Sequence, residues 1–437
     1  MTTLGRCPSL PDERHVLNPG DGMTGQKIPE FNILALGPPG SGKTIYLAML
    51  HFVISTGKLP EGVSFTIDDN TNRSWLHQVY NDMRDKNRLE LSEGTQVGDI
   101  REIGLRCKVE WPSRRGSLGR QIRGESHTAL VVNYTDYAGE RFTRASDFKI
   151  EGMEDAFQQK LQQAHVLLGI IDGEKLRRYL EDPAAHPLFF LDNVWPIVET
   201  IRSRPVPGHF VITKWDLLDG YTIEEIQTLL LESTSETGYE SLLQARSAER
   251  CAAGQAGRIR LIPVSSVGGF VQLGPKGMRK VGQAPLPKNV EIPLIASLVD
   301  ICDMARDAHR EQQRLEREAP RRTTAKSGGE NSDSSDAEIT VGPTGLKINL
   351  TAVAAFSVHA GAVVGRELGR PALGLGRFAR REYRRVRSHG LTGVRSEEGA
   401  LFYVGRGFQG RLADYEDRQQ PQTARALSSP ASPEGLD

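Results

Sequence analysis

The feature that most constrains this chain is a glycine-rich loop between two apolar segments near the N-terminus. Apolar residues 31–36 precede the loop, and apolar residues 45–50 follow it. The loop fits the pattern G-x-x-x-x-G-K-S/T at every position, reading Gly37-Pro38-Pro39-Gly40-Ser41-Gly42-Lys43-Thr44. This pattern forms a phosphate-binding loop when a strand precedes it and a helix follows it, which is the order predicted here.

The residue types in this loop predict how it would hold phosphate. Glycines let successive backbone N–H groups turn toward phosphate oxygens at a helix N-terminus, whose dipole favours anions. We expect Lys43 to contact the β- and γ-phosphates and the Thr44 hydroxyl to bind Mg²⁺. Pro39 removes one N–H from this cradle, because proline has none. The loop therefore predicts a nucleoside triphosphate site with Mg²⁺.

A carboxylate at the end of a second apolar segment completes the predicted phosphate site. Residues 129–134 are expected to form a buried strand that leads into Asp136-Tyr137-Ala138-Gly139-Glu140. Asp136 at the strand end can hold Mg²⁺ through water, and the N–H of Gly139 can bind the γ-phosphate.

Two further segments predict which base is bound. Apolar residues 210–212 lead into Thr213-Lys214-Trp215-Asp216, and residues 261–264 lead into Ser265-Ser266-Val267-Gly268. Asp216 would accept hydrogen bonds from guanine N1–H and N2–H₂, whereas adenine has no such pair of donors. The Lys214 stem can lie along the base, and a backbone N–H of the loop at Ser265 and Ser266 would contact guanine O6.

In order and placement these motifs resemble the TRAFAC class of P-loop GTPases, over about Phe31 to Ile301. The resemblance implies an α/β fold, a P-loop NTPase three-layer sandwich with a mainly parallel sheet. It also implies GTP or GDP and Mg²⁺ as ligands, and a molecular switch that hydrolyses GTP. The long first insertion and the D-Y-A-G-E form are similar to bacterial double-GTPase proteins of predicted conflict systems, which implies a second GTPase or an effector as partner.

Glu140 departs from the pattern of small GTPases, which usually place a glutamine directly after D-x-x-G to orient the attacking water. Glu140 is the candidate catalytic residue at that position, beside Lys43. A carboxylate can accept a hydrogen bond from water, but it cannot donate to the phosphoryl group and it repels the γ-phosphate. We therefore expect slow hydrolysis that a partner accelerates.

The threonine that would complete the Mg²⁺ site is not settled by the sequence. It is expected between the first helix and the second strand, which is predicted over residues 103–111. Thr95 is the candidate for contact with Mg²⁺ and the γ-phosphate, although an ordinary loop threonine is an equally good interpretation. Thr66 and Thr71 are alternatives.

Two alternative functions remain open. G-P-P-G-x-G-K-T is typical of AAA-type ATPases, but that family expects Asp-Glu after four apolar residues, and Tyr137 follows Asp136 here. The other alternative is a nucleotide-binding scaffold with little turnover.

Composition predicts a cytoplasmic protein without a specific nucleic-acid partner. The 55 Lys and Arg residues balance the 55 Asp and Glu residues, so net charge attracts no polyanion. The four cysteines lie far apart with no C-x-x-C, which fits a reducing compartment and argues against structural zinc.

Shifts in composition predict the domain organisation. We expect a disordered tail (1–27), a P-loop GTPase domain (28–316) with a helical insertion at about 58–95, a disordered linker (317–345), a small accessory segment (346–387) and a disordered tail (388–437).

The accessory segment is first apolar and then basic. Ile348 to Gly365 contains no charged residue, and residues 366–387 contain eight arginines and two glutamates, a charge of 8 − 2 = +6. We expect the apolar stretch not to span a membrane. Peripheral contact with an anionic membrane or an acidic partner is one hypothesis. A helix pair that packs on a protein surface is the alternative.

Overall fold

The computed structural model describes most of the chain between residues 28 and 419. The described residues are 28–56, 59–85, 100–111, 114–115, 121–122, 124–137, 153–233, 238–245, 258–269, 271–274, 277–280, 285–318, 338–341, 346–349 and 377–419. Residues 1–27, 319–337 and 420–437, for which disorder is predicted, lie outside this part of the chain, as do residues 350–376 of the accessory segment.

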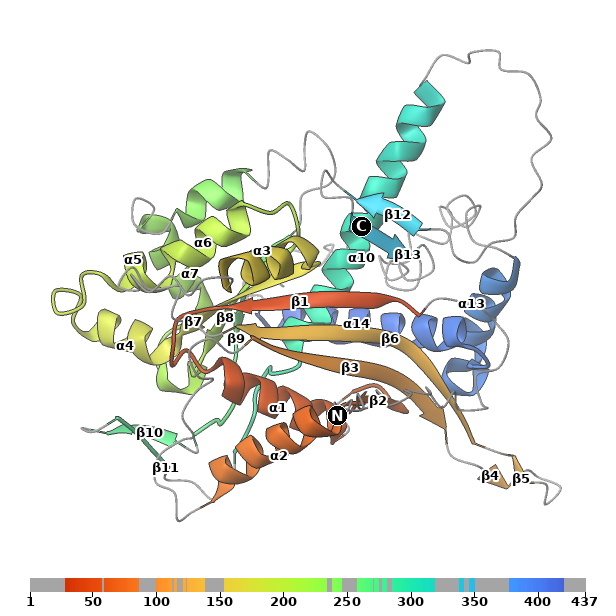
Figure 1. The fold of residues 1–437 in the computed structure, drawn as a ribbon, viewed down its shortest axis with the longest axis horizontal. Coiled ribbons are helices and arrows are strands. Elements are labelled where there is room, and N and C mark those ends of the chain that lie inside the picture. The colour runs from red at the N-terminus through yellow and green to blue at the C-terminus, as the bar shows by residue number, and fades with distance from the viewer. Residues whose placement is uncertain are drawn as a thin grey trace, which may run out of the picture.

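A seven-stranded sheet forms the centre of the fold, in the order β2-β3-β6-β1-β7-β8-β9 (Figure 1). Only β3 runs antiparallel to its neighbours, so the predicted α/β class and mainly parallel sheet are confirmed. The strands are β1 (Glu30–Leu36), β2 (Val63–Ile67), β3 (Ile100–Trp111), β6 (Glu125–Tyr137), β7 (Val166–Asp172), β8 (Gly208–Thr213) and β9 (Ile259–Pro263).

The central strands are continuous apolar runs because helices cover both faces of the sheet. Every residue of β7 and of β8 is buried. The helices are α1 (Lys43–Ser55), α2 (Asn70–Arg84), α3 (Met153–Gln163), α4 (Gly173–Glu181), α5 (Phe189–Asn193), α6 (Trp195–Arg202), α7 (Ile223–Glu232), α10 (Ile292–Glu318), α13 (Arg377–His389) and α14 (Glu397–Gln419).

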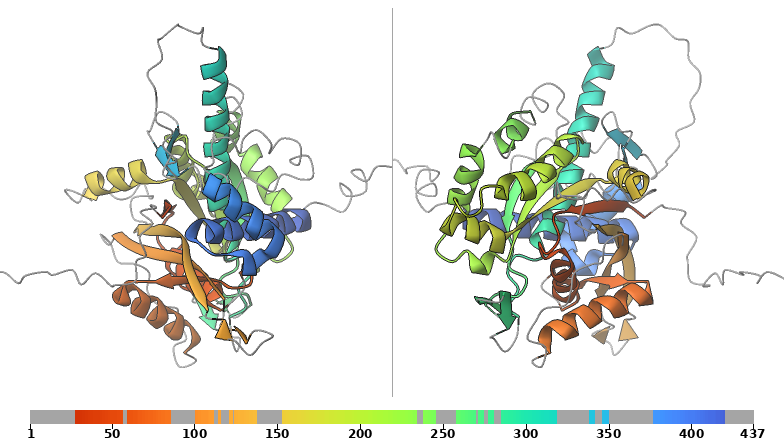
Figure 2. Two further views of the ribbon diagram at one scale, coloured as in Figure 1. Left: turned by 90° about the vertical axis from the view of Figure 1, so that its right-hand side faces the viewer. Right: turned by 60° about the vertical axis from the view of Figure 1, so that its left-hand side comes forward.

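Alternate residues of β1 divide the core into two layers, one on each face. Ile33 and Ala35 belong to a core that includes α1, α2, α10 and α14. Leu34 and Leu36 belong to a second core that includes α3 to α7. This alternation follows from the period-2 geometry of a strand. The arrangement is compatible with a three-layer sandwich, and Figure 2 shows helices on both sides of the sheet.

The predicted helical insertion at about 58–95 is only partly helical. It contains α2, but residues 63–67 form the edge strand β2, which pairs with β3 from Val63↔Val109 to Ile67↔Leu105. The reason is that β3 offers a free edge on the side away from β6, and Val63, Phe65 and Ile67 alternate so that all three are buried in the core on one face of the sheet.

The prediction of a disordered tail from residue 388 is wrong for residues 388–419. They include the end of α13, a short 3₁₀ helix (Gly390–Gly393) and the helix α14. Phe408 of α14 is fully buried and stacks on Phe65 of β2 with ring centroids 6.4 Å apart. Glycine permits close packing in α14, since a Cβ on Gly407 would lie 2.5 Å from Cγ of Pro60.

The prediction of a disordered linker over residues 317–345 is wrong for its described residues. Helix α10 continues to Glu318, and strand β12 (Glu338–Val341) pairs antiparallel with β13 (Leu346–Asn349). Two more hairpins are β4 (Arg114–Arg115) with β5 (Gln121–Ile122), and β10 (Val271–Gly274) with β11 (Gly277–Lys280). No helix among the described residues is long and apolar enough to cross a membrane.

Candidate functional site

The glycine-rich loop connects β1 directly to α1 and turns sharply because its glycines permit it. Gly40 and Gly42 have positive φ angles of 74° and 87°, a region that other residues rarely adopt. Gly37 packs against the neighbouring strand, where a Cβ would lie 2.7 Å from the carbonyl oxygen of Ile170. The first turn of α1 therefore begins at Lys43, with its backbone N–H groups at the loop.

The ammonium group of Lys43 lies inside the loop. It donates hydrogen bonds to the carbonyl oxygens of Gly37, at 2.9 Å, and Pro38, at 3.1 Å, and the residue is only 6 % exposed. A buried cation next to the N-terminus of a helix makes this loop attractive to an anion. Gly40 leaves open space, since a Cβ there would meet no atom within 4 Å.

Thr44 and Asp136 come together beside the loop. Their side chains approach to 3.3 Å between Oγ1 and Oδ2, and Asp136 is fully buried. The cause is sheet order: β6 pairs in parallel with β1, so that Ala35 lies opposite Asp136 at the carboxyl end of both strands. No three His, Cys, Asp or Glu side chains cluster in the described ranges as they would for a metal ion held by protein alone.

Thr213 ties the end of β8 to the phosphate loop. Its hydroxyl lies 2.6 Å from the carbonyl oxygen of Ser41 and 3.2 Å from that of Ile171, and the residue is 2 % exposed. A buried hydroxyl needs such partners. The contact makes the segment that follows β8 a fixed neighbour of the loop that follows β1.

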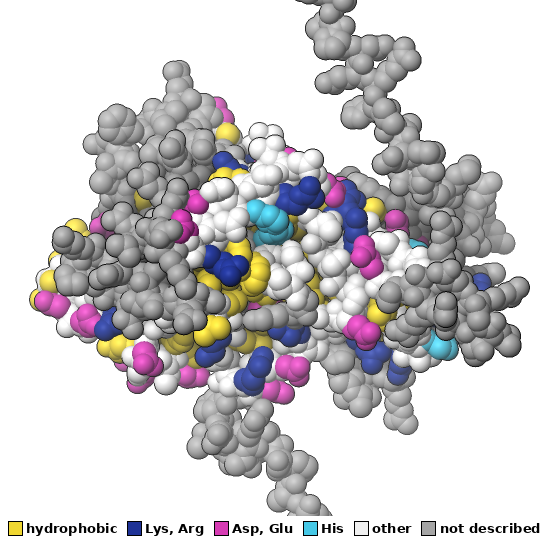
Figure 3. Space-filling view, turned by 90° about the horizontal axis from the view of Figure 1, so that it is seen from below, with side chains coloured by type: hydrophobic (Ala, Val, Ile, Leu, Met, Phe, Trp, Pro, Cys, Tyr) yellow, Lys and Arg dark blue, Asp and Glu magenta, His cyan; other side chains and the backbone are white. Residues whose placement is uncertain are grey.

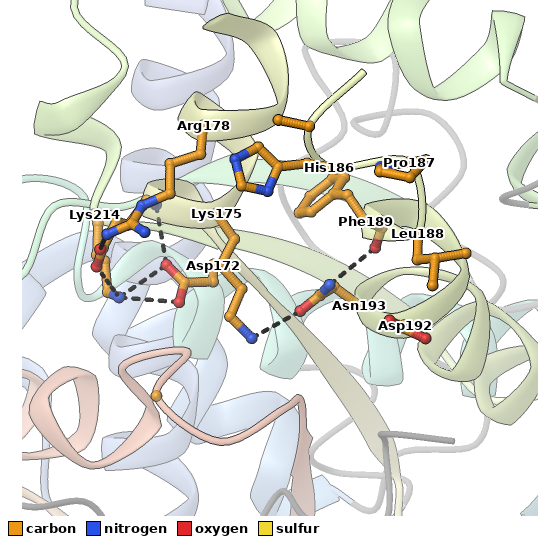
Figure 4. A pocket seen from close by; sticks show the side chains of 13 residues that line it. Asp172, Lys175, Arg178, His186, Pro187, Leu188, Phe189, Asp192, Asn193 and Lys214 are labelled. Atoms are coloured by element: carbon orange, nitrogen blue, oxygen red, sulfur yellow. Dashed lines mark hydrogen bonds and ion pairs between the residues drawn. The ribbon is translucent and has the colours of Figure 1, made fainter. Parts of the chain in front are cut away.

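Lys214 crosses from β8 into an ion-pair cluster at the N-terminus of α4 (Figure 4). Its ammonium group lies 2.8 Å from Asp172 Oδ1 and 3.2 Å from Glu174 Oε2. Asp172 also caps α4 by accepting a hydrogen bond from the backbone N–H of Glu174 at 3.0 Å. The Lys214 stem passes the phosphate loop, since its Cε lies 4.0 Å from where a Cβ on Gly42 would be.

Asp216 meets the loop that follows β9. One carboxylate oxygen accepts a hydrogen bond from the hydroxyl of Ser265, and the other accepts one from the backbone N–H of Gly269 at 3.3 Å. Ser265 in turn accepts from the N–H of Gly268 at 2.9 Å. Gly268 has a φ of 47°, and a Cβ there would clash with the carbonyl of Leu286. This loop therefore requires a glycine at that position.

The structure brings most of the predicted site residues to one edge of the sheet, at the carboxyl ends of β1, β6, β8 and β9. They are residues 37–44, Asp136, Thr213, Lys214, Asp216, Ser265 and Ser266. Thr95, Gly139 and Glu140 lie outside the described residues. The alternatives to Thr95 lie in the insertion, Thr66 within β2 and Thr71 at the start of α2.

A cavity of about 610 Å³ next to the phosphate loop contains residues that sequence reasoning missed. Gly40, Asp172 and Lys214 line it, and Lys175 reaches into it to donate a hydrogen bond to Asn193 at 3.0 Å (Figure 4). Asp172 had a signal in the sequence, because it follows an uninterrupted apolar strand as Asp136 does. Asn193 had none, since it lies within a helix.

Comparison with models of known protein families and with curated proteins found no match to this chain.

Proposed function

We propose that this chain binds GTP with Mg²⁺ at the carboxyl edge of the sheet and hydrolyses GTP to GDP as a molecular switch. The observation that carries the proposal is that Asp216 meets the loop at Ser265 on the same sheet edge as Lys43, Thr44 and Asp136. Ligands of open α/β sheets bind at this edge. The half of the edge with Lys43, Thr44 and Asp136 suits phosphates. The half with Asp216 and Ser265 suits a base with two adjacent hydrogen-bond donors.

The phosphate half would hold the triphosphate chain by charge and by backbone amides. Lys43 would exchange its two carbonyl partners for phosphate oxygens, forming charge-assisted hydrogen bonds that are stronger than the bonds they replace. Bound Mg²⁺ would neutralise phosphate charge. Thr44 would hold the ion through its hydroxyl, and Asp136 would hold it through a water molecule bound to its carboxylate.

The base half favours guanine over adenine. Guanine N1–H and N2–H₂ would donate to Asp216 in place of the backbone N–H of Gly269, whose bond is long at 3.3 Å. Adenine presents an acceptor at the equivalent position and would leave the carboxylate facing a lone pair. Thr213 joins the two halves, so the spacing between base and phosphate sites is fixed before the ligand arrives.

Turnover is expected to be slow without a protein partner. Pro39 supplies no N–H to the phosphate cradle, and the carboxylate of Glu140 is a poor substitute for a group that donates to the phosphoryl oxygens. In a switch, the γ-phosphate and Mg²⁺ order segments that hydrolysis then releases. A partner, a second GTPase or an effector, would read the difference between the GTP and GDP states.

Replacement of Asp216 by Asn tests the base assignment. The amide would pair with xanthine, which carries a carbonyl where guanine has its amino group, so we expect preference to move from GTP to XTP by about a hundredfold. The measurement is competition of GTP and XTP against a labelled guanine nucleotide. Asp219→Asn is the matched control, because Asp219 is exposed one turn away.

The two possible results decide whether Asp216 reads the base. Asp219→Asn should keep the wild-type preference for GTP. If Asp216→Asn also keeps it, Asp216 does not read the base and another residue carries the preference for guanine.

A further inference from the structure

Helix α13 carries a stripe of arginines along one side. Its sequence is RFARREYRRVRSH, with six arginines and one glutamate. At about 100° per residue, helix positions 377, 380, 381, 384 and 387 fall within an arc of about 120°. All five positions are arginines, and the stripe is about 15 Å long. We call these five residues the arginine stripe.

The described side chains of the arginine stripe have no counter-charge. Arg381, Arg384 and Arg387 are exposed, and none of them forms a hydrogen bond or ion pair with a described residue. The sixth arginine, Arg385, pairs with Glu382 at 2.7 Å instead. Glu382 is 2 % exposed, so its negative charge does not lie on the surface with the stripe.

The opposite side of α13 is already packed. Val386 is 3 % exposed, and Tyr383 meets Phe402 of α14 with ring centroids 5.4 Å apart. Glu382 accepts a hydrogen bond from Ser396 at 3.2 Å. These contacts hold the described apolar residues of α13 against the protein, and the exposed side that Arg381, Arg384 and Arg387 share is charged.

Helix α13 lies at the end of the molecule opposite the phosphate loop. In Figure 1, β1 runs from the side of α13 toward the loop that precedes α1, and the left view of Figure 2 shows α13 facing the reader. The hairpin of β4, whose two residues are Arg114 and Arg115, lies at the same end. The face seen from below differs, because described acidic and basic side chains are interspersed on it (Figure 3).

We propose that the arginine stripe binds the surface of an anionic phospholipid bilayer. Clusters of four to eight basic residues on a helix are attracted to anionic lipids within about a Debye length of the surface. Guanidinium groups also match phosphate oxygens in geometry. With α13 on the bilayer, the nucleotide edge faces the solvent, where a partner can reach it.

A nucleic acid offers the same phosphate chemistry but fits this chain less well. The aromatic residue described on α13, Tyr383, packs inward and is not placed to stack on bases. The sequence shortly before α13 contains the uncharged stretch from Ile348 to Gly365, and a membrane surface accepts apolar and basic segments together.

Sedimentation of the full chain with lipid vesicles tests this inference independently of the nucleotide assignment. The probe is vesicles of equal parts phosphatidylglycerol and phosphatidylcholine, compared with vesicles of phosphatidylcholine alone. We expect binding to the anionic vesicles only, weakening as salt is raised. Each lipid-facing arginine contributes about fivefold to affinity, so the triple variant R381Q/R384Q/R387Q should bind about a hundredfold more weakly.

Two further variants separate surface charge from other effects. R73Q/R84Q/R202Q removes three exposed arginines on α2 and α6, lowers the net charge by the same amount, and should bind vesicles as the wild type does. R381K/R384K/R387K keeps the charge and should retain binding.

Any of three results would overturn the proposal: no binding to anionic vesicles, equal binding to neutral vesicles, or unchanged binding by R381Q/R384Q/R387Q. Binding to duplex DNA or RNA without binding to vesicles would assign the stripe to nucleic acid instead.

Discussion

The phosphate-loop edge and the C-terminal helices α13 and α14 occupy the same folded unit but differ in how their sequences encode structure. At the edge, chemistry demands particular residue types at fixed spacing, such as the glycines and Lys43 of the loop. In α14 the requirement is only that Phe402, Val404 and Phe408 find apolar neighbours, and many sequences would satisfy it. Local motifs therefore reveal the first region, whereas long-range packing creates the second.

The two regions should also respond differently to mutation. The polar groups of the edge have partners that a ligand can replace, as the carbonyl partners of Lys43 illustrate. The buried side chains of α14 are packed away from water, and no ligand can replace the packing contacts that a mutation removes. Changes at the edge should alter binding and leave stability nearly unchanged, and changes in α14 should do the reverse.

The largest expected effect is on stability, from Phe408→Ala. Phe408 is fully buried and stacks on Phe65, so removal of its ring leaves a cavity under the sheet. We expect the free energy of unfolding to fall by about 4 kcal/mol, measured by denaturant titration. Leu188→Ala is the control, because Leu188 is 56 % exposed and its loss should cost less than about 0.5 kcal/mol. A small effect of Phe408→Ala would mean that α14 does not belong to the core.

The next effect, on binding, comes from Lys43→Ala. Loss of the ammonium group should weaken triphosphate binding by at least about a hundredfold, or about 3 kcal/mol, since a charge-assisted contact disappears. Stability should change little, because the two lost hydrogen bonds are offset by relief from burying a cation. Isothermal titration with GTP measures the first and thermal unfolding the second. Lys108→Ala on β3 controls for lost charge and should bind GTP normally.

The smallest effect comes from a buried charge network that connects α14 with the amino ends of β8 and β9, away from the nucleotide edge. His209 of β8 lies 3.6 Å from Asp300 of α10, which also binds Arg260 of β9, and Arg260 contacts Glu416 of α14. Burial lowers the pKa of His209 from 6.5 to about 4. The negative charge of Asp300 opposes this shift, and the positive charge of Arg260 lowers the pKa by a smaller amount. Between these two pKa values His209 is therefore protonated in the unfolded chain and neutral in the folded chain.

Because the folded pKa is depressed, stability is lost as pH falls from 6.5 toward about 4. Between pH 7 and pH 5 this one histidine should cost about 2 kcal/mol. His209→Gln should remove that part of the slope. Burial lowers the pKa of His165 to about 4 as well, so the quantity to measure is the difference in slope between the variant and the wild type. Equal slopes would mean that burial does not depress the pKa of His209 in the folded chain.

The sequence predicted most strands and the functional residues at their ends, but it did not predict the contacts between side chains and loops that are far apart in the sequence. Asp136 and Asp216 were recognisable because each follows an apolar strand, and parallel strands carry their ends to one edge. The hydrogen bond of Thr213 to the loop at Ser41 joins residues far apart in the sequence, and no local pattern signals it. Strand β2 was missed for the same reason, because its partner β3 lies far along the sequence.

The most direct test of the proposed function is competition binding of the purified chain with GTP, GDP, ATP and ADP in the presence of Mg²⁺. The geometry of Asp216 and the loop at Ser265 predicts that GTP and GDP bind and that ATP and ADP compete at least about a hundredfold more weakly. Equal or tighter binding of ATP would contradict the guanine assignment and leave a phosphate site with a different base.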